Sequence, residues 1–368
     1  TPSLESYSNA VAGKYGYVSL TTRFGNVCMP EIEVVDIAEL KRKKLMNGPF
    51  SPLLLREIRQ ALERKEQVIL FQNRRGFAPV VECHVCGWTP QCPHCDVSLT
   101  YHKRTNQLTC HYCGFSTSIA QRCPQCDADS LNSKGYGTER IEDVLSSVFP
   151  EARVARMDLD TTRSRSAYEG IIKGFQHGDT DILIGTQMVT KGLDFRRVSV
   201  VGILNASTML NQPDFRSYER AYQMMTQVAG RAGRSNASND GAVRPGRVIL
   251  QVHDASQPTV QQVVRGDFED MYRTQMEERR LFNYPPHCRL IYVYMKHKDE
   301  RVLEHLAEEM ARLLRQVFGH RVLGPDMPPV ARVQTMCIRK VCLKLEVGAT
   351  MAEARKRLLD IQRYLVAK

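Results

Sequence analysis

The 368-residue chain lacks the Gly-x-x-x-x-Gly-Lys-Ser/Thr loop with which many nucleotide-hydrolysing proteins hold phosphates. Its Gly13-Lys14 pair and the reversed pair Lys191-Gly192 have neither the upstream glycine at the required spacing nor the following hydroxyl. A phosphate cradle of that kind is therefore excluded within the chain.

Long apolar runs are also missing. No segment approaches the roughly 20 apolar residues that span a bilayer, and no charged and apolar signal segment follows Thr1. Because the chain begins without methionine, we expect it to be part of a longer protein, and we expect that protein in the cytoplasm. The hydrophobic content of 42% is sufficient for the cores of two or three domains.

Acidic residues are outnumbered by basic ones, and the formal net charge is +11. This balance favours a polyanion as partner. The excess is largest at residues 330–368, which hold nine Lys or Arg and three acids. We expect Arg332, Arg339, Lys340 and Lys344 to track DNA phosphates; the alternative is that they are solvated charges of edge strands.

The pattern of the twelve cysteines argues against a disulfide framework. Eight of them form four Cys-x-x-Cys pairs in one window, and four thiolates in a tetrahedron suit Zn²⁺, so we predict two structural zinc ions. The predicted ligands are Cys83, Cys86, Cys92, Cys95, Cys110, Cys113, Cys123 and Cys126. Shells filled by sulfur leave no open position for catalytic water.

The connectivity of the zinc sites depends on residues 96–109, which are typical of a two-stranded hairpin turning at 103–107. The hairpin would bring the inner pair that ends at Cys95 and the inner pair that begins at Cys110 together at one zinc site. The outer pairs would then form the second zinc site. The only tryptophan, Trp88, either packs against a neighbouring domain or stacks on an unpaired base.

Short apolar strands without polar alternation recur along the chain, with amphipathic helices between them. They are expected at 67–71, 153–157, 181–185, 198–204 and 247–251, with further extended pieces at 17–22 and 31–35. This order predicts an α/β fold with a parallel sheet covered by helices on both faces. After one long polar helix that begins near residue 258, the order β-α-β-β-α predicts a ferredoxin-like α+β domain without its last strand.

The segment GTQMVTKGLDF at 185–195 begins at the carboxyl end of a predicted parallel strand, where open α/β sheets bind ligands. Gly192 would let backbone approach a phosphate, while Thr186 and Lys191 would bind nucleic-acid backbone or nucleotide. Asp194 would position a ribose hydroxyl or a neighbouring loop. An ordinary strand-to-helix turn is the alternative for this segment taken alone.

The segment QVAGRAGR at 227–234 ends a predicted helix. Its Gln-x-x-Gly-Arg-x-Gly-Arg signature comprises Gln227, Gly230, Arg231, Gly233 and Arg234. Guanidinium groups at such a position are commonly aimed at the γ-phosphate of a nucleotide. The alternative, a glycine-rich helix cap with solvated arginines, explains the pair of motifs poorly.

Together the two segments resemble motifs V and VI of superfamily 2 helicases, whose second RecA-like lobe faces a first lobe that carries the P-loop. Further stretches narrow the resemblance to the replication-restart (primosomal) helicase family. They are VILFQNRRGFAP before the cysteine window, and then GYGTERIEDVL, RMDLDTT and PDFRSYERAYQ. The resemblance covers almost the whole chain, and the opening TPSLES resembles the end of motif III, which closes the first lobe.

The resemblance implies an α/β fold: a RecA-like lobe 2 with an inserted binuclear zinc subdomain that uses all eight cysteines of the window, and a ferredoxin-like C-terminal domain. It divides the chain into the end of lobe 1 with a linker (1–12), lobe 2 (13–80 and 130–256), the zinc-binding insertion (81–129), a linker helix (257–288) and the α+β domain (289–368).

The resemblance also implies an ATP-dependent 3′ to 5′ DNA helicase that recognises stalled or repaired replication forks and initiates primosome assembly. Its catalytic residues would be Arg231, Arg234 and Gln227, acting on ATP and Mg²⁺ held by the first lobe, so this chain alone should not hydrolyse ATP. Gly192, Asp194, Gly230 and Gly233 would border the nucleotide. The expected DNA contacts are Asn73, Arg74, Arg75, Thr138, Thr186 and Lys191.

The implied partners are forked and single-stranded DNA, single-stranded-DNA-binding protein and other primosome proteins, without a membrane, and we expect a monomer. The alternatives are a non-catalytic zinc and DNA docking module, or another superfamily 2 DNA translocase. One departure is Ser207, which stands where the family usually has an acid, so the role of that acid is in doubt here. Asp158 and Asp160 are predicted to be turn and capping residues rather than Mg²⁺ ligands.

Overall fold

The computed structural model forms two compact units, one from Thr1–Ala78 with Tyr136–Gln275 and the other from Pro79–Gly135 with Met276–Lys368. The cysteine window, predicted as an insertion into lobe 2, thus shares a unit with the C-terminal domain. The structure describes residues 1–20, 28–72, 80–83, 88–102, 106–110, 112–129, 131–134, 138–158, 161–162, 164–187, 195–212, 214–233 and 245–367.

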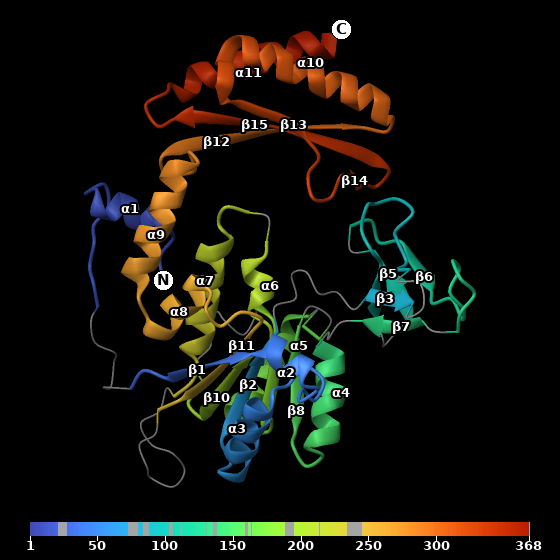
Figure 1. Ribbon diagram of the computed structural model, residues 1–368, viewed down its shortest axis with the longest axis vertical. Coiled ribbons are helices and arrows are strands. Elements are labelled where there is room, and N and C mark those ends of the chain that lie inside the picture. The colour runs from blue at the N-terminus through green and yellow to red at the C-terminus, as the bar shows by residue number, and fades with distance from the viewer. Residues whose placement is uncertain are drawn as a thin grey trace. The chain divides into compact units, whose positions relative to one another are not determined.

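The first unit is built on a six-stranded sheet whose neighbouring strands are all parallel (Figure 1). The strand order is β1-β11-β10-β2-β9-β8. The strands are β1 (Glu31–Asp36), β2 (Gln67–Phe71), β8 (Val154–Met157), β9 (Ile182–Gly185), β10 (Val198–Ile203) and β11 (Arg247–Val252). The predicted α/β fold with a parallel sheet is confirmed.

Two apolar cores cover the two faces of this sheet, because successive side chains of a strand point to opposite faces. Along β2, Val68 and Leu70 belong to one core and Ile69 and Phe71 to the other. The first core packs against α3 (Pro52–Glu63) and α4 (Thr138–Val148); the second packs against α5 (Arg165–His177), α6 (Ser207–Leu210), α7 (Ser217–Ala229) and α8 (Pro258–Arg265). A short helix, α2 (Ile37–Arg42), follows β1.

Two local predictions differ from the structure. Residues 17–20 form no regular element, and 21–22 lie outside the described residues. The single long helix expected from residue 258 is two helices, α8 and α9 (Phe268–Leu281). Gly266 separates them because it caps α8 in the left-handed conformation, with φ of 66°.

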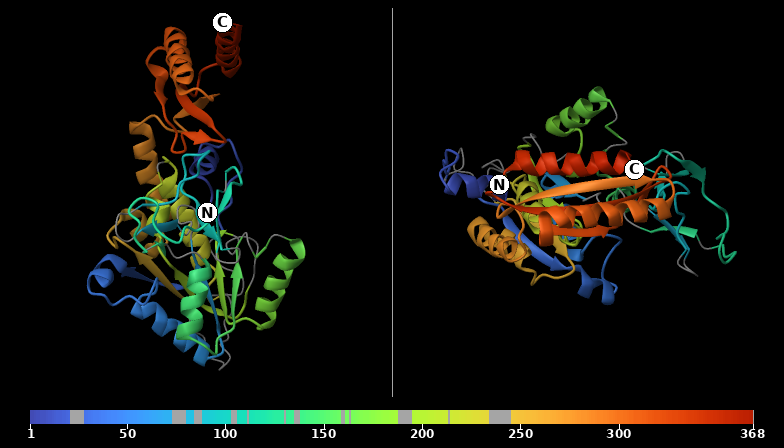
Figure 2. Two further views of the ribbon diagram at one scale, coloured as in Figure 1. Left: turned by 90° about the vertical axis from the view of Figure 1, so that its right-hand side faces the viewer. Right: turned by 90° about the horizontal axis from the view of Figure 1, so that it is seen from above.

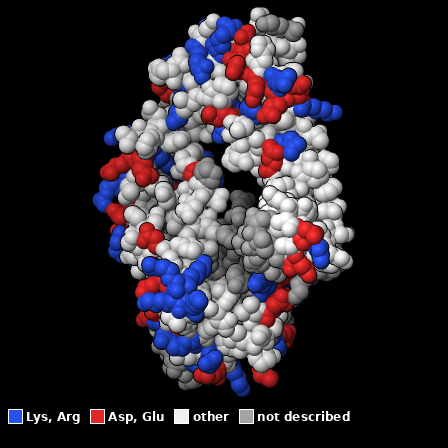
Figure 3. All heavy atoms as spheres, turned by 45° about the vertical axis from the view of Figure 1, so that its right-hand side comes forward, with Lys and Arg blue, Asp and Glu red and all other residues white. Residues whose placement is uncertain are grey.

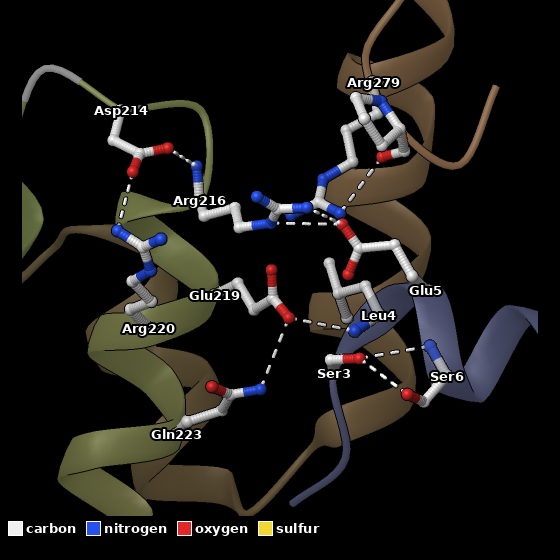
Figure 4. Close-up of polar contacts among 11 residues, drawn as sticks. Ser3, Leu4, Glu5, Ser6, Asp214, Arg216, Glu219, Arg220, Gln223 and Arg279 are labelled. Carbon is white, nitrogen blue, oxygen red and sulfur yellow. Dashed lines mark hydrogen bonds and ion pairs between the residues drawn. The ribbon is translucent and has the colours of Figure 1, made fainter. Parts of the chain in front are cut away.

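The N-terminal helix α1 (Leu4–Val11) packs onto α7 (Figure 4). Leu4 is fully buried in the same apolar core as the buried side chains of α7. Its backbone N–H donates to Oε1 of buried Glu219 at 2.9 Å. Arg216 holds the Glu5 carboxylate at 2.7 Å. The segment predicted as the end of lobe 1 is therefore joined to the core of lobe 2 in this structure.

The C-terminal domain of the second unit has a sheet of order β12-β15-β13, in which β12 and β13 both pair antiparallel with β15. This is the split β-α-β arrangement of the predicted ferredoxin-like type. Helices α10 and α11 run side by side along it (Figure 2). Its elements are β12 (Cys288–His297), α10 (Glu300–Phe318), the 3₁₀ turn η3 (Gly319–Arg321), β13 (Val322–Asp326), β14 (Arg332–Val333), β15 (Met336–Glu346) and α11 (Met351–Ala367).

The cysteine-rich part of the second unit has two small antiparallel sheets. In the first, β3 (Val80–Cys83) pairs with β7 (Leu131–Lys134). The second contains β4 (Thr100–His102), β5 (Gln107–Thr109) and β6 (Ser116–Ser118). The predicted hairpin is confirmed as β4 and β5, although residues 103–105 of its turn lie outside the described residues.

Candidate metal centre and sheet-edge motifs

Four cysteines from the two inner pairs meet in space. The Sγ atoms of Cys92, Cys95, Cys110 and Cys113 all lie within 4.8 Å of one another. The pairs come from turns that flank β4 and β5, so the hairpin brings them together as the sequence predicts. The second Cys-x-x-Cys pair of the window therefore joins the third pair and not the first.

The donor chemistry of this cluster fits zinc. Four sulfur ligands without a carboxylate or an open position match a structural Zn²⁺ site. Burial, together with the neighbouring thiols of Cys113 and Cys110, raises the pKa of Cys92 to about 12. A divalent cation reverses this because it neutralises thiolates that would otherwise repel one another in a buried place. When bound, the ion would hold the two turns together.

The turn at Cys123 repeats the backbone pattern of the turn at Cys110. In each, the cysteine N–H donates to the carbonyl five residues on, at 2.8 Å for Cys110 and 3.0 Å for Cys123. In each, the residue four positions on donates back to the cysteine carbonyl at 2.9 Å and has positive φ, 78° at Gly114 and 55° at Asp127. The Cys123 turn therefore has the same local form as a turn that holds two ligands of the cluster.

The other outer ligands are less fully described. Cys123 is buried and Cys126 exposed, while Cys86 and the side chain of Cys83 lie outside the described residues. Trp88 is half-buried, which is compatible with either of its two predicted roles.

The motif that starts at Gly185 leaves the sheet at its carboxyl edge. Thr186, directly after β9, is buried, and its backbone N–H donates to the Met157 carbonyl at the end of β8. Lys191, Gly192 and Asp194 lie outside the described residues. The next described residue, Phe195, is buried. It lies just before β10, which begins at the opposite edge of the sheet, where the strands have their amino ends.

The motif at 227–234 also reaches this opposite edge of the sheet, where the amino end of β10 lies. Gly230 caps the C-terminus of α7, Gln227 is exposed on the last turn, and Arg231 is buried. The backbone N–H of Gly233 donates to the carbonyl of Val198, the first residue of β10, at 2.9 Å. Arg234 follows and lies outside the described residues. The structure thus separates Thr186, at the carboxyl ends of the strands, from Gly233, at the amino end of β10.

Close backbone approach fixes the position of Gly233. Its φ is 65°, and a Cβ atom there would lie 2.5 Å from the backbone nitrogen of Gly246. A Cβ on Gly246 would in turn lie 2.4 Å from the nitrogen of Gly233. Only glycine fits at these two facing positions, so the second motif is held against the segment that enters β11.

Thr138, an expected DNA contact, is the first residue of α4 and is buried. Its hydroxyl donates to Oδ2 of Asp158 at 2.5 Å, so the hydroxyl is already used in a hydrogen bond within the fold. Oδ1 of Asp158 accepts the Thr161 N–H at 3.0 Å, which confirms Asp158 as a turn residue. Asp160 and the expected contacts Asn73, Arg74 and Arg75 lie outside the described residues.

An ion-pair cluster ties β8 to α4 beside Asp158. The Arg156 guanidinium lies 2.9 Å from Glu142 and 3.4 Å from Glu139. Burial raises the pKa of Glu142, and Arg156 acts in the opposite direction. These charges stabilise the contact between α4 and the edge strand of the sheet.

Ser207, where the resemblance leads one to expect an acid, has a structural role. It is buried, and its hydroxyl oxygen accepts the backbone N–H of His253 at 2.8 Å. This bond links the segments that follow β10 and β11, and it needs an acceptor but no charge.

Two of the four cations expected to track DNA phosphates in the C-terminal domain form ion pairs in the structure. Arg332 pairs with Asp96 at 2.9 Å, and buried Arg339 pairs with Glu300 and Glu304 at 2.7 and 3.1 Å. Two of the four cations are therefore neutralised by carboxylates that only the fold brings near. On the face of this domain that is drawn at the top of Figure 3, blue and red side chains lie next to one another.

A surface that the sequence analysis missed lies on the sheet face away from the core. Tyr292 and Tyr294 of β12 are 43% and 56% exposed, with ring centroids 6.3 Å apart. They lie opposite Cys342 and Lys340 of β15, and the Lys340 ammonium is 5.8 Å from the Tyr292 ring. The alternation in RLIYVYMKH was the available signal, because it places both tyrosines on one face.

No helix in the part of the chain that the structure describes is long and apolar enough to cross a membrane.

Comparisons with known proteins agree with these features. A family model described as the PriA DNA helicase Cys-rich region domain matches residues 92–117, which include the four clustered cysteines. The replication restart protein PriA of Bacillus subtilis (strain 168) is 39% identical over 365 residues, or 98% of this chain and 44% of that protein. The chain is a homologue of PriA. The PriA of Haemophilus influenzae is 38% identical over 336 residues, or 90% of this chain and 44% of that protein.

The PriA similarity extends through the parallel sheet. A second model, the helicase conserved C-terminal domain, matches residues 135–236, which contain both sheet-edge motifs. Among solved structures, S. cerevisiae Dbp5 bound to RNA and ADP BeF3 aligns over 74% of this chain and 51% of that chain, with a TM-score of 0.33 and 15% identity. The chain spans about 44% of the length of the two PriA relatives.

Proposed function

We propose that the chain supplies the second RecA-like lobe, a zinc-binding region and a C-terminal DNA-binding domain to an ATP-dependent DNA helicase of replication restart. The PriA relatives and the matched helicase domain support this function. The observation that carries it is the Gly233–Val198 hydrogen bond, because it puts the end of the arginine motif at the sheet edge where the motif beginning at Gly185 also ends.

In this proposal the arginine motif acts on ATP held by a P-loop outside this chain. Arg234 directly follows Gly233 and stabilises the charge that develops as water attacks the γ-phosphorus and the bond to the ADP oxygen breaks. Buried Arg231 supports the same edge, and exposed Gln227 is available to a facing lobe. Asp194 directly precedes Phe195, so Asp194, Gly192, Gly230 and Gly233 border the nucleotide from this side.

The DNA partners in this proposal are forked and single-stranded DNA. Thr186, Lys191 and the basic stretch Asn73, Arg74 and Arg75 contact backbone near the carboxyl edge. Since the Thr138 hydroxyl is bonded to Asp158, α4 contributes through the backbone N–H groups of its first turn. The 3′ to 5′ polarity, the monomeric state and binding to single-stranded-DNA-binding protein and other primosome proteins complete the proposal.

Two structural zinc ions belong to the proposal. The first is held by Cys92, Cys95, Cys110 and Cys113. The second is held by Cys83, Cys86, Cys123 and Cys126, and its support is the repeated backbone form of the Cys123 turn.

The motor function is tested by mixing this chain with a separately produced first lobe from the same protein, with DNA and ATP present. Each part alone should hydrolyse little ATP, and the mixture should restore DNA-stimulated turnover. Arg234→Ala should lower the restored rate by roughly 10³-fold, because an arginine at the γ-phosphate acts mainly on the transition state.

Arg220→Ala is the matched control. Arg220 also lies on α7, but its guanidinium pairs with Asp214 at 2.6 Å away from the motif. Turnover of this variant should stay near the unmodified level. Restored turnover that survives Arg234→Ala would reject the arginine assignment, and DNA binding without any restored turnover would favour the non-catalytic docking module.

A further inference from the structure

The hairpin of β14 and β15 in the C-terminal domain contacts the loop that carries Cys95. The Asp96 N–H donates to the Arg332 carbonyl at 3.0 Å, and the Thr335 N–H donates to the His94 carbonyl at 2.8 Å. The Arg332 guanidinium also pairs with the Asp96 carboxylate at 2.9 Å. Backbone and side-chain contacts thus join the hairpin to the residues on both sides of Cys95, although 236 positions separate Asp96 from Arg332 in the sequence.

One contact reaches the metal-binding atom itself. The backbone N–H of Gln334 donates to Cys95 Sγ at 3.2 Å. Hydrogen bonds to a thiolate reduce its negative charge and fix its direction, which is how groups outside the coordination sphere tune a metal. The side chain of Val333 packs into the same apolar cluster as Leu99 and Leu108, next to the clustered cysteines.

The backbone of the hairpin turn is held in an unfavourable conformation. Its two central residues, Gln334 and Thr335, have φ of 50° and 68°. Two-residue turns of this kind usually contain Asn-Gly or Gly-Gly, and positive φ is rare for a β-branched residue such as Thr. The contacts with the cysteine loop supply an interaction that stabilises this turn, since they use both of its N–H groups.

We propose that residues 332–335 form part of the metal site, holding the Cys95 thiolate, and that zinc occupancy and hairpin docking stabilise each other. The proposal depends on zinc at the Cys92–Cys113 cluster but not on ATP hydrolysis. By linkage, whatever free energy the docked hairpin adds to zinc binding is also the free energy that zinc adds to docking.

The first test measures zinc release from the zinc-loaded chain, using a chromogenic chelator in excess. Arg332→Ala should accelerate release from the Cys92–Cys113 cluster by roughly 2- to 5-fold, because an exposed ion pair contributes little. The double variant Arg332→Ala, Val333→Ala should accelerate it by roughly 10-fold or more, as outer contacts of metal ligands commonly do.

Two further variants separate the contact from general effects. Arg312→Ala removes another exposed pair of this domain, with Glu309 on α10, and should leave the release rate unchanged. Exchanging the charges, Asp96→Arg with Arg332→Asp, should restore slow release if the pair acts by direct contact. Release that is equally fast in the Arg312 control, or unaltered in the double variant, would overturn the proposal.

The second test runs in the reverse direction. Amide hydrogen exchange of Gln334 and Thr335 should be slow in the zinc-loaded chain. After zinc is removed it should be roughly 10-fold or more faster, because the metal no longer stabilises the docked hairpin against opening. Amides of β12 should keep their protection, because that strand pairs within the sheet. Unchanged exchange at Gln334 and Thr335, with zinc loss verified by metal analysis, would show that docking does not depend on the metal.

Discussion

At the scale of single residues, small backbone turns shape the zinc-binding region. The left-handed residues Gly114 and Asp127 let the chain fold back so that the N–H groups point toward a cysteine. Asp tolerates this conformation because of its short polar side chain. The same turn therefore recurs with different residues, and the Cys-x-x-Cys spacing is its sequence signal.

This repeated turn leads to a prediction of zinc content. The unmodified chain should contain two zinc ions, and Cys123→Ser should contain one, because a zinc site with three thiolates binds far more weakly. Metal analysis after dialysis against a moderate chelator measures the ratio. Cys28→Ser, which alters an exposed cysteine outside the window, should keep both ions. Two ions retained by Cys123→Ser would contradict the role of Cys123 as a zinc ligand.

At the scale of elements, α7 delivers the arginine motif to one edge of the sheet. The helix is long enough to return from the carboxyl end of β10 to its amino end, where Gly233 bonds to Val198. The facing glycines Gly233 and Gly246 then hold the motif closely against the segment that enters β11. The position of Arg231 thus depends on backbone geometry.

Two glycine substitutions should have opposite effects on the first unit. Gly233→Ala should lower the free energy of unfolding by about 1–3 kcal/mol, since the residue has positive φ and its Cβ would meet backbone. Gly170→Ala, within α5 and without any atom near its added Cβ, should raise it by about 0.5–1 kcal/mol. Urea unfolding measures both changes. Equal effects of the two variants would mean that the Gly233–Gly246 approach does not hold the motif.

At the scale of the whole molecule, part of the basic excess of the C-terminal domain is engaged in ion pairs with acids. Arg332 and Arg339 are paired with acids, so the tyrosine face of β12 with Lys340 is the better candidate for contact with single-stranded DNA. Exposed aromatic rings stack on bases of any sequence, and a few lysines beside them bind the backbone.

DNA binding should therefore respond more to the rings than to the paired arginines. Tyr292→Ala should weaken binding of single-stranded DNA by about 5- to 100-fold, as loss of one stacked base does, while Tyr292→Phe should retain most of the affinity. Lys340→Ala should reduce the slope of log affinity against log salt by about 0.7. Tyr364→Ala, on exposed α11, is the control. An unchanged affinity in Tyr292→Ala would exclude this face.

Most strands and helices, and the four cysteines that cluster, could be predicted from residue order alone, because these features depend on local patterns. Apolar strands such as 67–71 and 247–251 could be predicted since burial on both faces leaves no polar alternation. The hairpin between the inner cysteine pairs was equally local. The order of the motifs along the chain also indicates a helicase lobe.

The contacts between side chains that are far apart in the sequence became clear only from the folded chain. The fold placed Gly233 of the arginine motif at the amino end of β10, joined α1 to α7, and paired Arg332 and Arg339 with acids. It also brought Gln334 to Cys95. Backbone N–H groups carry no sequence signature, and an ion pair depends on the distance between folded segments, so neither could be predicted from residue types alone.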